Sequence, residues 1–415
     1  MTNLPPTIFV LGTDRDIGKT VTCIGLISNL LGPDCGYRLA DIGYIKPLGQ
    51  QVVRVRDSDG KPIDVSADKD AVLVTQLMGI DCDRYGDMSP VVWERGLSEE
   101  IIDSAADGTL ASIREQIMQR IRGAYQRVAQ GKRIVLVEGT GQPGVGSVGG
   151  VSNSDVIRSL VEMGASVFVI LVTEGGIGST IDRVFPYIMA LDHLDTHIDG
   201  LVINNVRVSK MEKVTRYITS YYQHVFPDIY GHLVSEGKAP RLLGFIPEVP
   251  ELRLPTFRQV AEFLQSRTGI VETITEHDWS EPRSDLPLVR NVKVISLDFG
   301  YERYLSPGDV VVVGVNANDV ILSTLLLHER MLRTKREGLS GLILSCKQAG
   351  GLDTEIRELI RARSLPTITV ELDSAEIVQR LDSTTWKIQP YDELKRRLIA
   401  EAYRENLTLW PELKA

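Results

Sequence analysis

Cysteine and long apolar stretches are scarce in this sequence and a net positive charge is missing, and each of these features excludes a class of protein. The four cysteines lie far apart and form no C-x-x-C pair, so neither a structural zinc site nor a disulfide framework is expected. The longest apolar run covers only 167–172, which is too short to cross a bilayer, and the first residues do not resemble a signal peptide. We therefore expect a cytoplasmic protein without a membrane partner.

The charge balance is acidic, with a formal net charge of -9. A protein of this charge offers no broad positive surface that could displace counterions along a phosphate backbone, so a nucleic-acid partner is not expected. Hydrophobic residues make up 43% of the chain and charged residues 24%, which is typical of globular domains. At 415 residues, the chain is long enough for two or three such units.

The first two thirds of the chain alternate between short apolar runs and segments with a helical pattern. The runs lack polar alternation, which is typical of strands in a parallel sheet that is covered on both faces. This order predicts a doubly wound, mainly parallel α/β domain over residues 1–268. The expected strands are 8–11, 134–137, 167–172, 201–203 and 242–246, and the expected helices are 112–129, 155–163, 181–191 and 210–222, with one more beginning near 19.

A second, smaller α/β domain is expected over residues 291–415. The polar segment 269–290 has no clear period and contains two prolines, which indicates a linker. Beyond it, apolar runs again alternate with helical patterns. The runs are 310–313, 341–344 and 366–370, the helices 319–333 and 355–363, and further helical segments follow near 391–405.

The strongest chemical signal is a turn that joins the first predicted strand to the first predicted helix and ends in Gly18, Lys19 and Thr20. Phosphate binding requires this arrangement, because backbone N–H groups and the positive end of a helix then face the anion. Lys19 is expected to reach the β and γ phosphates, and the Thr20 hydroxyl to bind Mg²⁺. The nucleotide contacts expected from the loop are Gly12, Thr13, Asp14, Asp16, Ile17, Gly18, Lys19, Thr20 and Val21.

Two further charged residues follow predicted strands. Glu138 ends the run 134–137, where P-loop proteins place the carboxylate that holds Mg²⁺. Lys46, in the segment 45–47, follows a further predicted strand that precedes the run 134–137 along the chain, and it is expected to face the crevice at the carboxyl edge of the sheet.

Other positions leave alternatives open. Asp70 fits either a metal ligand or a helix N-terminal acid, and Asn204 either an amide that contacts a purine edge or a local turn. The glycine-rich stretch 139–150 fits either close approach to an anion or a flexible linkage. In the glycine-rich stretch 175–180, Ser179 or Thr180 could instead cap the following helix.

Together these motifs resemble the dethiobiotin synthetase family of P-loop proteins. The family loop G-T-D-T-x-x-G-K-T is similar to residues 12–20, and its Y-K-P-V element to 45–48. Its S-D-A segment is similar to 69–71, V-E-G-A-G to 137–141, N-R-V to 204–206 and L-G-x-I-P to 243–247. The resemblance implies that Thr20, Asp70 and Glu138 bind Mg²⁺, that Lys46 contacts the substrate and the transferring phosphate, and that the protein is a homodimer.

The later part of the chain resembles a different family. Residues 307–310, 318–322 and 341–344 are similar to the DRTGG-type domain that follows a dethiobiotin synthetase-like domain in long-form phosphotransacetylases. In those proteins the pair of domains is regulatory.

Two functional hypotheses follow, and both require ATP and Mg²⁺ as ligands. The first is an ATP-dependent ligase, in which the γ-phosphate activates a carboxylate or carbamate of an unidentified small-molecule acceptor. Lys19 and Lys46 are then the catalytic residues. The second is a nucleotide-sensing regulatory protein that resembles the regulatory domains of phosphotransacetylase and has no synthetic reaction of its own.

Overall fold

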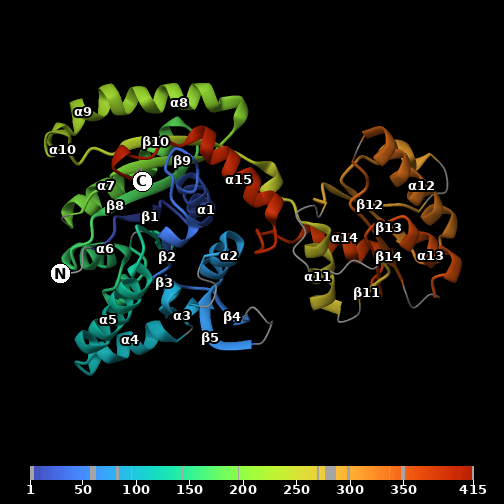
Figure 1. Ribbon diagram of the computed structural model, residues 1–415, viewed down its shortest axis with the longest axis horizontal. Coiled ribbons are helices and arrows are strands. Elements are labelled where there is room, and N and C mark those ends of the chain that lie inside the picture. The colour runs from blue at the N-terminus through green and yellow to red at the C-terminus, as the bar shows by residue number, and fades with distance from the viewer. Residues whose placement is uncertain are drawn as a thin grey trace. The chain divides into compact units, whose positions relative to one another are not determined.

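The chain forms two compact units, one made of Met1–Val249 together with Arg396–Ala415 and the other of Pro250–Lys395. The computed structural model is drawn in Figure 1. It describes residues 4–56, 62–80, 84–94, 96–142, 144–194, 196–268, 271–275, 287–296, 300–335, 337–346 and 351–413.

A six-stranded parallel sheet forms the centre of the first unit, in the order β10-β9-β8-β1-β7-β2. Strands β1, β2 and β7 are buried along their whole length, which explains why they lack polar alternation. Because β1 lies between β7 and β8, the carboxyl ends of these three strands meet at one edge of the sheet. The strands are β1 (Thr7–Gly12), β2 (Ile42–Ile45), β7 (Ile134–Glu138), β8 (Val167–Glu174), β9 (Gly200–Val206) and β10 (Arg241–Pro247).

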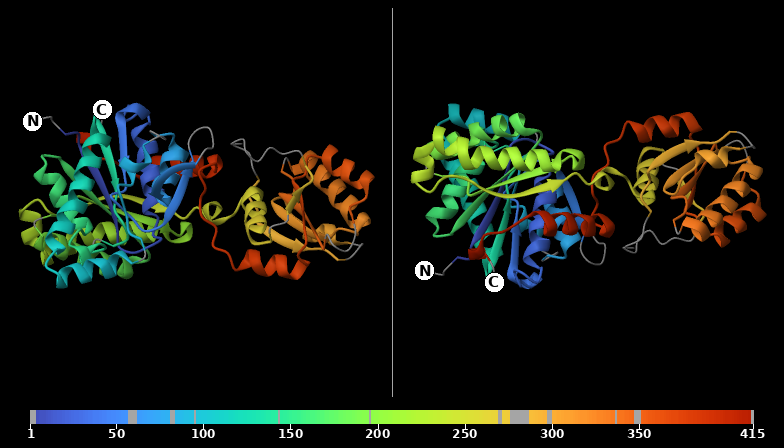
Figure 2. Two further views of the ribbon diagram at one scale, coloured as in Figure 1. Left: turned by 90° about the horizontal axis from the view of Figure 1, so that it is seen from below. Right: turned by 90° about the horizontal axis from the view of Figure 1, so that it is seen from above.

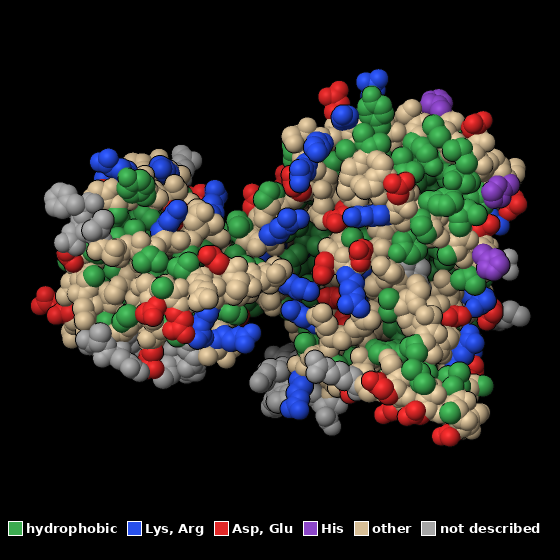
Figure 3. Space-filling model, turned by 180° about the vertical axis from the view of Figure 1, so that it is seen from behind, with side chains coloured by type: hydrophobic (Ala, Val, Ile, Leu, Met, Phe, Trp, Pro, Cys, Tyr) green, Lys and Arg blue, Asp and Glu red, His purple; other side chains and the backbone are tan. Residues whose placement is uncertain are grey.

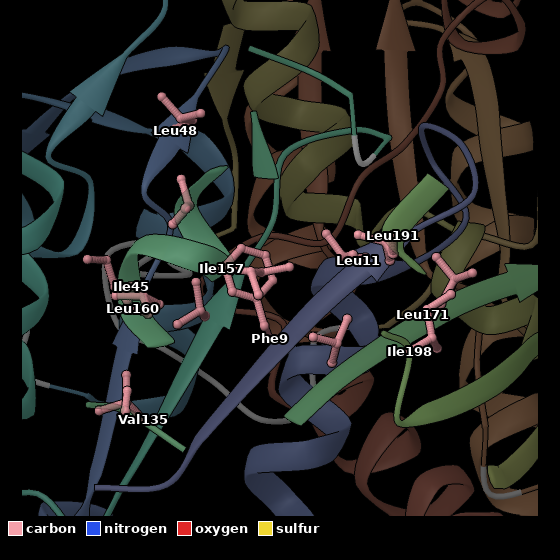
Figure 4. Close-up of a cluster of buried hydrophobic side chains, with 14 of the residues drawn as sticks. Phe9, Leu11, Ile45, Leu48, Val135, Ile157, Leu160, Leu171, Leu191 and Ile198 are labelled. Carbon is pink, nitrogen blue, oxygen red and sulfur yellow. The ribbon is translucent and has the colours of Figure 1, made fainter. Parts of the chain in front are cut away.

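Helices cover both faces of this sheet (Figure 2). On one face, Phe9 and Leu11 of β1 join a large apolar cluster with side chains from α5, α6, α7 and α8 (Figure 4). On the other face lie α1 and the later part of α15, where the Tyr403 ring packs against Gly25. The helices are α1 (Lys19–Leu30), α5 (Leu110–Ala129), α6 (Asn153–Glu162), α7 (Ile177–His193), α8 (Met211–Ser220), α9 (Phe226–Ile229), α10 (Gly231–Ser235) and α15 (Glu393–Asn406), with a π-helical turn at Tyr221–Val225.

A group of small elements, which the sequence did not predict, fills the chain between β2 and α5. The antiparallel hairpin of β4 and β5 leads directly into α2. The short strand β3 follows the turn after Lys46 and pairs in parallel with β6. They are β3 (Leu48–Gly49), β4 (Val52–Arg56), β5 (Pro62–Asp68), α2 (Lys69–Met78), α3 (Tyr85–Met88), β6 (Val91–Val92) and α4 (Leu97–Ala106).

The second unit is a five-stranded sheet in the order β11-β15-β14-β13-β12, parallel except for β11. Two apolar clusters cover its faces, one around Val311 and Leu342 and the other around Val310 and Ile343. The elements are α11 (Phe257–Thr268), β11 (Val271–Thr273), β12 (Asn291–Val294), β13 (Asp309–Gly314), α12 (Asn318–Lys335), β14 (Gly341–Ser345), α13 (Thr354–Ala362), β15 (Thr367–Val370) and α14 (Ser374–Asp382).

The fold class expected from the sequence is confirmed, but the expected boundaries at 268 and 291 are not those of the structure. Helix α11 belongs to the second unit, because Phe257 and Leu264 pack against β13 and β14. The segment from Arg396 onward returns to the first unit, where the Trp410 ring lies 5.4 Å from that of Phe168. Part of the expected linker 269–290 forms β11, and its residues 269–270 and 276–286 lie outside the described chain.

Within the described residues, none of the helices combines the length and the apolar character that a membrane crossing needs.

Candidate functional site

The loop between β1 and α1 has the backbone geometry of a phosphate-binding turn. Gly18 has φ +92 and Asp16 has φ 52, so the chain enters α1 through left-handed conformations. Gly18 is also the N-cap of α1 and has no side chain that could cap the first turn, and no acidic residue lies in that turn. The first N–H groups of the helix are therefore free to face an anion, whose charge the helix dipole favours.

Side chains from two neighbouring elements hold this loop. The Tyr187 hydroxyl donates to the carbonyl of Thr13 at 2.8 Å, and Nδ2 of Asn204 donates to the carbonyl of Ile17 at the same distance. A Cβ built on Gly18 would lie only 2.3 Å from Nδ2 of Asn204. Only glycine fits at position 18, because both the positive φ and the close approach of Asn204 exclude a side chain.

Asn204 is thus placed beneath the loop, with both ends of its amide bonded inside the protein. Its Oδ1 accepts a hydrogen bond from the Tyr403 hydroxyl at 3.4 Å, and the side chain is only 3% exposed. The contact with a purine edge that the sequence suggested stays a prediction.

Lys19 lies in the first turn of α1 with its side chain folded along the loop. Its Nζ donates to the carbonyl of Asp14 at 2.8 Å. Burial lowers the pKa of this ammonium group, although the nearby charge of Glu138 opposes the shift. A buried ammonium bonded to one neutral carbonyl can exchange that partner for a phosphate oxygen, which would satisfy its charge better.

The remaining loop residues surround this lysine. A Cβ on Gly12 would collide with the side chains of Ile17 and Lys19, at 2.7 and 2.9 Å. Thr13 is buried, with its hydroxyl donating to that of Thr173 at 3.2 Å, whereas the side chains of Asp14 and Asp16 are exposed. Thr20 and Val21 are half-buried in the first turn of α1.

Behind the loop, Lys46 lies at the centre of a cluster of three carboxylates. Its Nζ lies 3.0 Å from Oδ1 of Asp68 and 3.3 Å from Oε1 of Glu138, and it forms a still closer ion pair with Asp70. Burial disfavours the charge of this amine, but the three carboxylates outweigh it and raise its pKa above the usual lysine value. Lys46 is therefore held as a buried cation.

Glu138 connects this cluster to the P-loop. It is fully buried at the carboxyl end of β7, where Oε1 accepts a hydrogen bond from the Thr20 hydroxyl at 2.9 Å and Oε2 one from Tyr44 at 2.7 Å. Burial and the charge of Glu138 together raise the pKa of Tyr44 well above its ordinary value, so this phenol stays a donor. The structure thus brings Lys46 and Glu138, which the sequence placed after strands, together with Thr20 of the P-loop and Asp70 at the start of α2.

Asp68 is a functional candidate that the sequence did not single out. Its carboxylate accepts N–H bonds from Gln50 at 2.8 Å, Gln51 at 3.1 Å and Asp70 at 2.9 Å, and it also pairs with Lys46. Although burial opposes the shift, Lys46 lowers the pKa of Asp68 below its usual value. Asp68 is the N-cap of α2. Its place two residues before Asp70 is the sequence feature from which it could have been identified.

The two glycine-rich stretches have different structural roles. In the first, Asn153 pins the backbone: it accepts from the N–H of Thr140 at 3.1 Å and donates to the carbonyls of Thr140 and Gln142. In the second, the Ser179 hydroxyl accepts from the N–H of Gly176 at 3.1 Å at the start of α7, which is the helix-cap alternative. Pro143 in the first stretch lies outside the described chain.

The donor set fits a hard cation that retains part of its water shell. Within the residues that the structure describes, no three His, Cys, Asp or Glu side chains are grouped closely enough to hold a metal by themselves. Asp70 and Glu138 nevertheless share the ammonium of Lys46, and Thr20 adds a hydroxyl. One or two carboxylates and a hydroxyl, completed by phosphate oxygens and water, are the usual protein contribution at Mg²⁺ sites.

Charged side chains of both signs lie on the face drawn in Figure 3. On this face, Lys and Arg side chains are interspersed with Asp and Glu side chains.

The first unit has the features of a P-loop nucleotide-binding protein. It is a parallel sheet in which a glycine-containing turn leads into the N-terminus of a helix, and a lysine–carboxylate cluster lies at the same edge of the sheet. The chain belongs to the AAA domain family (AAA_26), whose match covers residues 6–256. Residues 287–384 match the DRTGG domain family. The two-part resemblance found in the sequence is thereby confirmed.

The curated relatives agree with both parts. Phosphate acetyltransferase of Pseudomonas putida is 25% identical over 395 residues, which is 94% of this chain and 49% of that protein. ATP-dependent dethiobiotin synthetase BioD of Caldicellulosiruptor saccharolyticus is 30% identical over 134 residues, which is 32% of this chain and 47% of that protein. The chain thus spans about half the length of the curated relatives it matches.

Among solved structures, the MinC:MinD cell division protein complex of Aquifex aeolicus matches at 13% identity and a TM-score of 0.29, covering 60% of this chain and 84% of that chain. The fold is assigned from the strand order of the sheet and from the family match.

Proposed function

We propose that this protein binds a Mg²⁺–nucleoside triphosphate, with ATP as the expected nucleotide, and uses the γ-phosphate to activate a small oxyanionic acceptor. The observation that carries the proposal is the shared carboxylate: Glu138 accepts from the Thr20 hydroxyl of the P-loop and pairs with Lys46 through the same oxygen. The P-loop and the buried ammonium of Lys46 therefore lie next to the same carboxylate.

The charges in the site support binding of a triphosphate only together with a divalent cation. Counted as ionised, Lys19 and Lys46 supply two positive charges against the three negative charges of Asp68, Asp70 and Glu138. A surplus of negative charge repels a triphosphate unless a divalent cation enters with it. Thr20, Asp70 and Glu138 would hold Mg²⁺, which neutralises charge on the phosphate oxygens.

Each side chain then has a separate task. The N–H groups of the loop and of the first turn of α1 would bind the β-phosphate, and Lys19 would leave the carbonyl of Asp14 for phosphate oxygens. Lys46 is held in place by its ion pairs, so its ammonium is already oriented toward charge that grows during transfer. Asp68 fixes Lys46 and the start of α2 and need not touch the nucleotide.

The proposed acceptor is a carboxylate or carbamate, the class that the resemblance to dethiobiotin synthetases implies. A carboxylate or carbamate oxygen attacks the γ-phosphorus, the bond from the γ-phosphorus to the bridging oxygen breaks, and ADP leaves with the bond electrons. An amine can then capture the activated carbonyl and release phosphate. The similarity to a dethiobiotin synthetase over 134 residues supports an ATP-dependent ligase of this kind. A homodimer, which the resemblance implies, remains part of the proposal and is measured by sedimentation.

The second candidate is a nucleotide-sensing regulatory protein without its own synthetic reaction. The observation that favours it is the extent of the match to phosphate acetyltransferase, which covers 94% of this chain and so both of its units. In this case nucleotide occupancy of the P-loop would bias the second unit or a partner, and turnover would be slow.

Phosphate release from Mg·ATP separates the two candidates. Wild type is compared with Lys19→Ala and with Lys213→Ala, an exposed lysine of α8 that serves as the matched control. Each is assayed with and without bicarbonate and a pool of small diamines and dicarboxylic acids. Stimulation by a pool member that is lost only in Lys19→Ala supports the ligase.

Tight binding of Mg·ATP without stimulated turnover would favour the sensor instead. Absence of any Mg·ATP binding by wild type would overturn both candidates.

A further inference from the structure

Helix α15, the last long helix of the chain, places a buried tyrosine against the P-loop helix. The Tyr403 side chain is 1% exposed, and its ring lies where a Cβ on Gly25 would stand, 2.2 Å from its Cγ. A glycine at position 25 is what permits α15 to approach α1 this closely. The hydroxyl of Tyr403 lies 2.7 Å from that of Thr22, one turn beyond the start of α1.

The hydrogen bonds around this hydroxyl form a chain with one direction. Tyr403 donates its single proton to Oδ1 of Asn204, so the Thr22 hydroxyl must be the donor in its own contact with Tyr403. At the far end, Nδ2 of Asn204 donates to the carbonyl of Ile17 inside the P-loop. The chain therefore links the C-terminal helix to the backbone of the phosphate-binding turn through one amide.

The amide of Asn204 supports the strained segment 16–18 of the loop. Asp16 and Gly18, on either side of Ile17, both have positive φ, and a non-glycine residue such as Asp16 is strained there. Such a conformation persists only where the surrounding structure fixes it. Fixing Oδ1 of Asn204 toward Tyr403 leaves Nδ2 pointing at the loop, which is the orientation that the carbonyl of Ile17 requires.

We infer that Tyr403 is a positioning residue for the P-loop: it orients Asn204 and thereby keeps the loop in the conformation that binds phosphate. The inference rests on the proposed nucleotide binding and extends it to a residue that does not touch the nucleotide. It also gives a role to the returning segment, since α15 begins with three residues of the second unit and continues from Arg396 in the first.

The test is nucleotide affinity in Tyr403→Phe, which removes the hydroxyl and keeps the ring against Gly25. Titration of wild type and variant uses Mg²⁺ with a non-hydrolysable ATP analogue. The dissociation constant is expected to rise about three- to tenfold, the loss that one buried hydrogen bond produces. The matched control is Tyr125→Phe, whose buried hydroxyl bonds Thr7 at 2.6 Å at the opposite end of β1. It should lower the melting temperature similarly and leave the dissociation constant unchanged.

A second comparison distinguishes positioning from general stabilisation. If Tyr403 acts through Asn204, then Tyr403→Phe has no further effect on affinity in an Asn204→Ala background, because the group that it orients is gone. The inference is overturned if Tyr403→Phe binds the analogue as tightly as wild type does. It is also overturned if Tyr125→Phe loses as much affinity for the analogue as Tyr403→Phe. Failure of wild type to bind the analogue contradicts the proposed function itself and is a separate outcome.

Discussion

The Lys46 ammonium lies 3.3 Å from Oε1 of Glu138, and the same oxygen accepts the hydrogen bond of the Thr20 hydroxyl. A carboxylate shared by a P-loop hydroxyl and a buried amine has to satisfy both partners at once. Removing the carboxylate, the amine or the loop geometry should therefore produce different defects, which the following experiments separate.

Glu138→Gln keeps the volume of the side chain and removes its charge. Because Glu138 is expected to hold Mg²⁺, the affinity for ATP in excess Mg²⁺ should fall about tenfold or more, the loss of one charge-assisted contact. Affinity in EDTA should change little. The control is Glu174→Gln, since Glu174 also ends a strand of the sheet but bonds Asn205 outside the cluster. Equal losses with and without Mg²⁺ would contradict the predicted metal role.

Lys46→Met leaves three carboxylates close together without their cation. The free energy of unfolding in metal-free buffer should fall by about 3 kcal/mol, the typical result of removing one partner from a buried ion pair. Mg²⁺ should restore more stability in the variant than in wild type, because a cation relieves the same repulsion. Urea unfolding with and without Mg²⁺ measures both effects.

The matched control for Lys46→Met is Lys238→Met. Lys238 also pairs with two carboxylates, Asp192 at 2.7 Å and Glu236 at 2.8 Å, but it does so at the surface. Its removal should cost much less, since solvent screens exposed ion pairs. Similar losses in the two variants would show that burial of Lys46 does not determine its contribution.

Gly18→Ala tests the close approach beneath the loop. The substitution adds a Cβ that collides with Asn204 where φ is +92, so nucleotide binding should be lost while the rest of the fold remains. Gly164→Ala has nearly the same φ, +91, and nothing within 4 Å of the added atom. It should therefore lower stability by about 1 kcal/mol and leave nucleotide affinity unchanged. Nucleotide titration and thermal melting of both variants measure these two effects. Normal nucleotide binding by Gly18→Ala would contradict the phosphate-binding role of the loop.

His328 is expected to make the stability of the second unit sensitive to acid. It is buried, and its Nδ1 accepts a hydrogen bond from the N–H of Leu339 at 3.1 Å. Burial lowers the pKa of this imidazole below the ordinary 6.5, a shift that the adjacent charge of Glu329 only partly opposes. The unfolded chain therefore binds the proton first, so stability is full above pH 6.5 and is lost as the pH falls through 6.5 toward the folded-state value.

His328→Gln should remove this part of the pH dependence. Melting temperatures of wild type and variant are compared from pH 8 down to about pH 5, because the difference between them cancels the other titrating groups. Their separation should change below pH 6.5. A separation that stays constant over this range would show that His328 is not the responsible group.

The local patterns of the sequence determined much of the first unit. Apolar runs without polar alternation predicted β1, β7, β8, β9 and β10 of the first sheet and β13, β14 and β15 of the second, because strands covered on both faces expose no polar side. The strands β11 and β12 were not predicted. The P-loop was also predictable: strand, Gly18-Lys19-Thr20 and helix follow one another within a few residues, so no distant contact is needed to recognise the turn. Lys46 and Glu138 could be placed because the carboxyl ends of parallel strands meet at one edge.

Only the tertiary structure decided which segments pack together across the length of the chain. The sequence of α11 does not show which sheet the helix covers, and the expected boundary at 268 therefore differs from the observed division at 249. Thr22 and Tyr403 bond across 381 positions, and no local pattern records such a pair. Hydrophobic burial is non-directional, which is why a sequence reveals which faces are apolar, whereas their partners emerge only when the whole chain has packed.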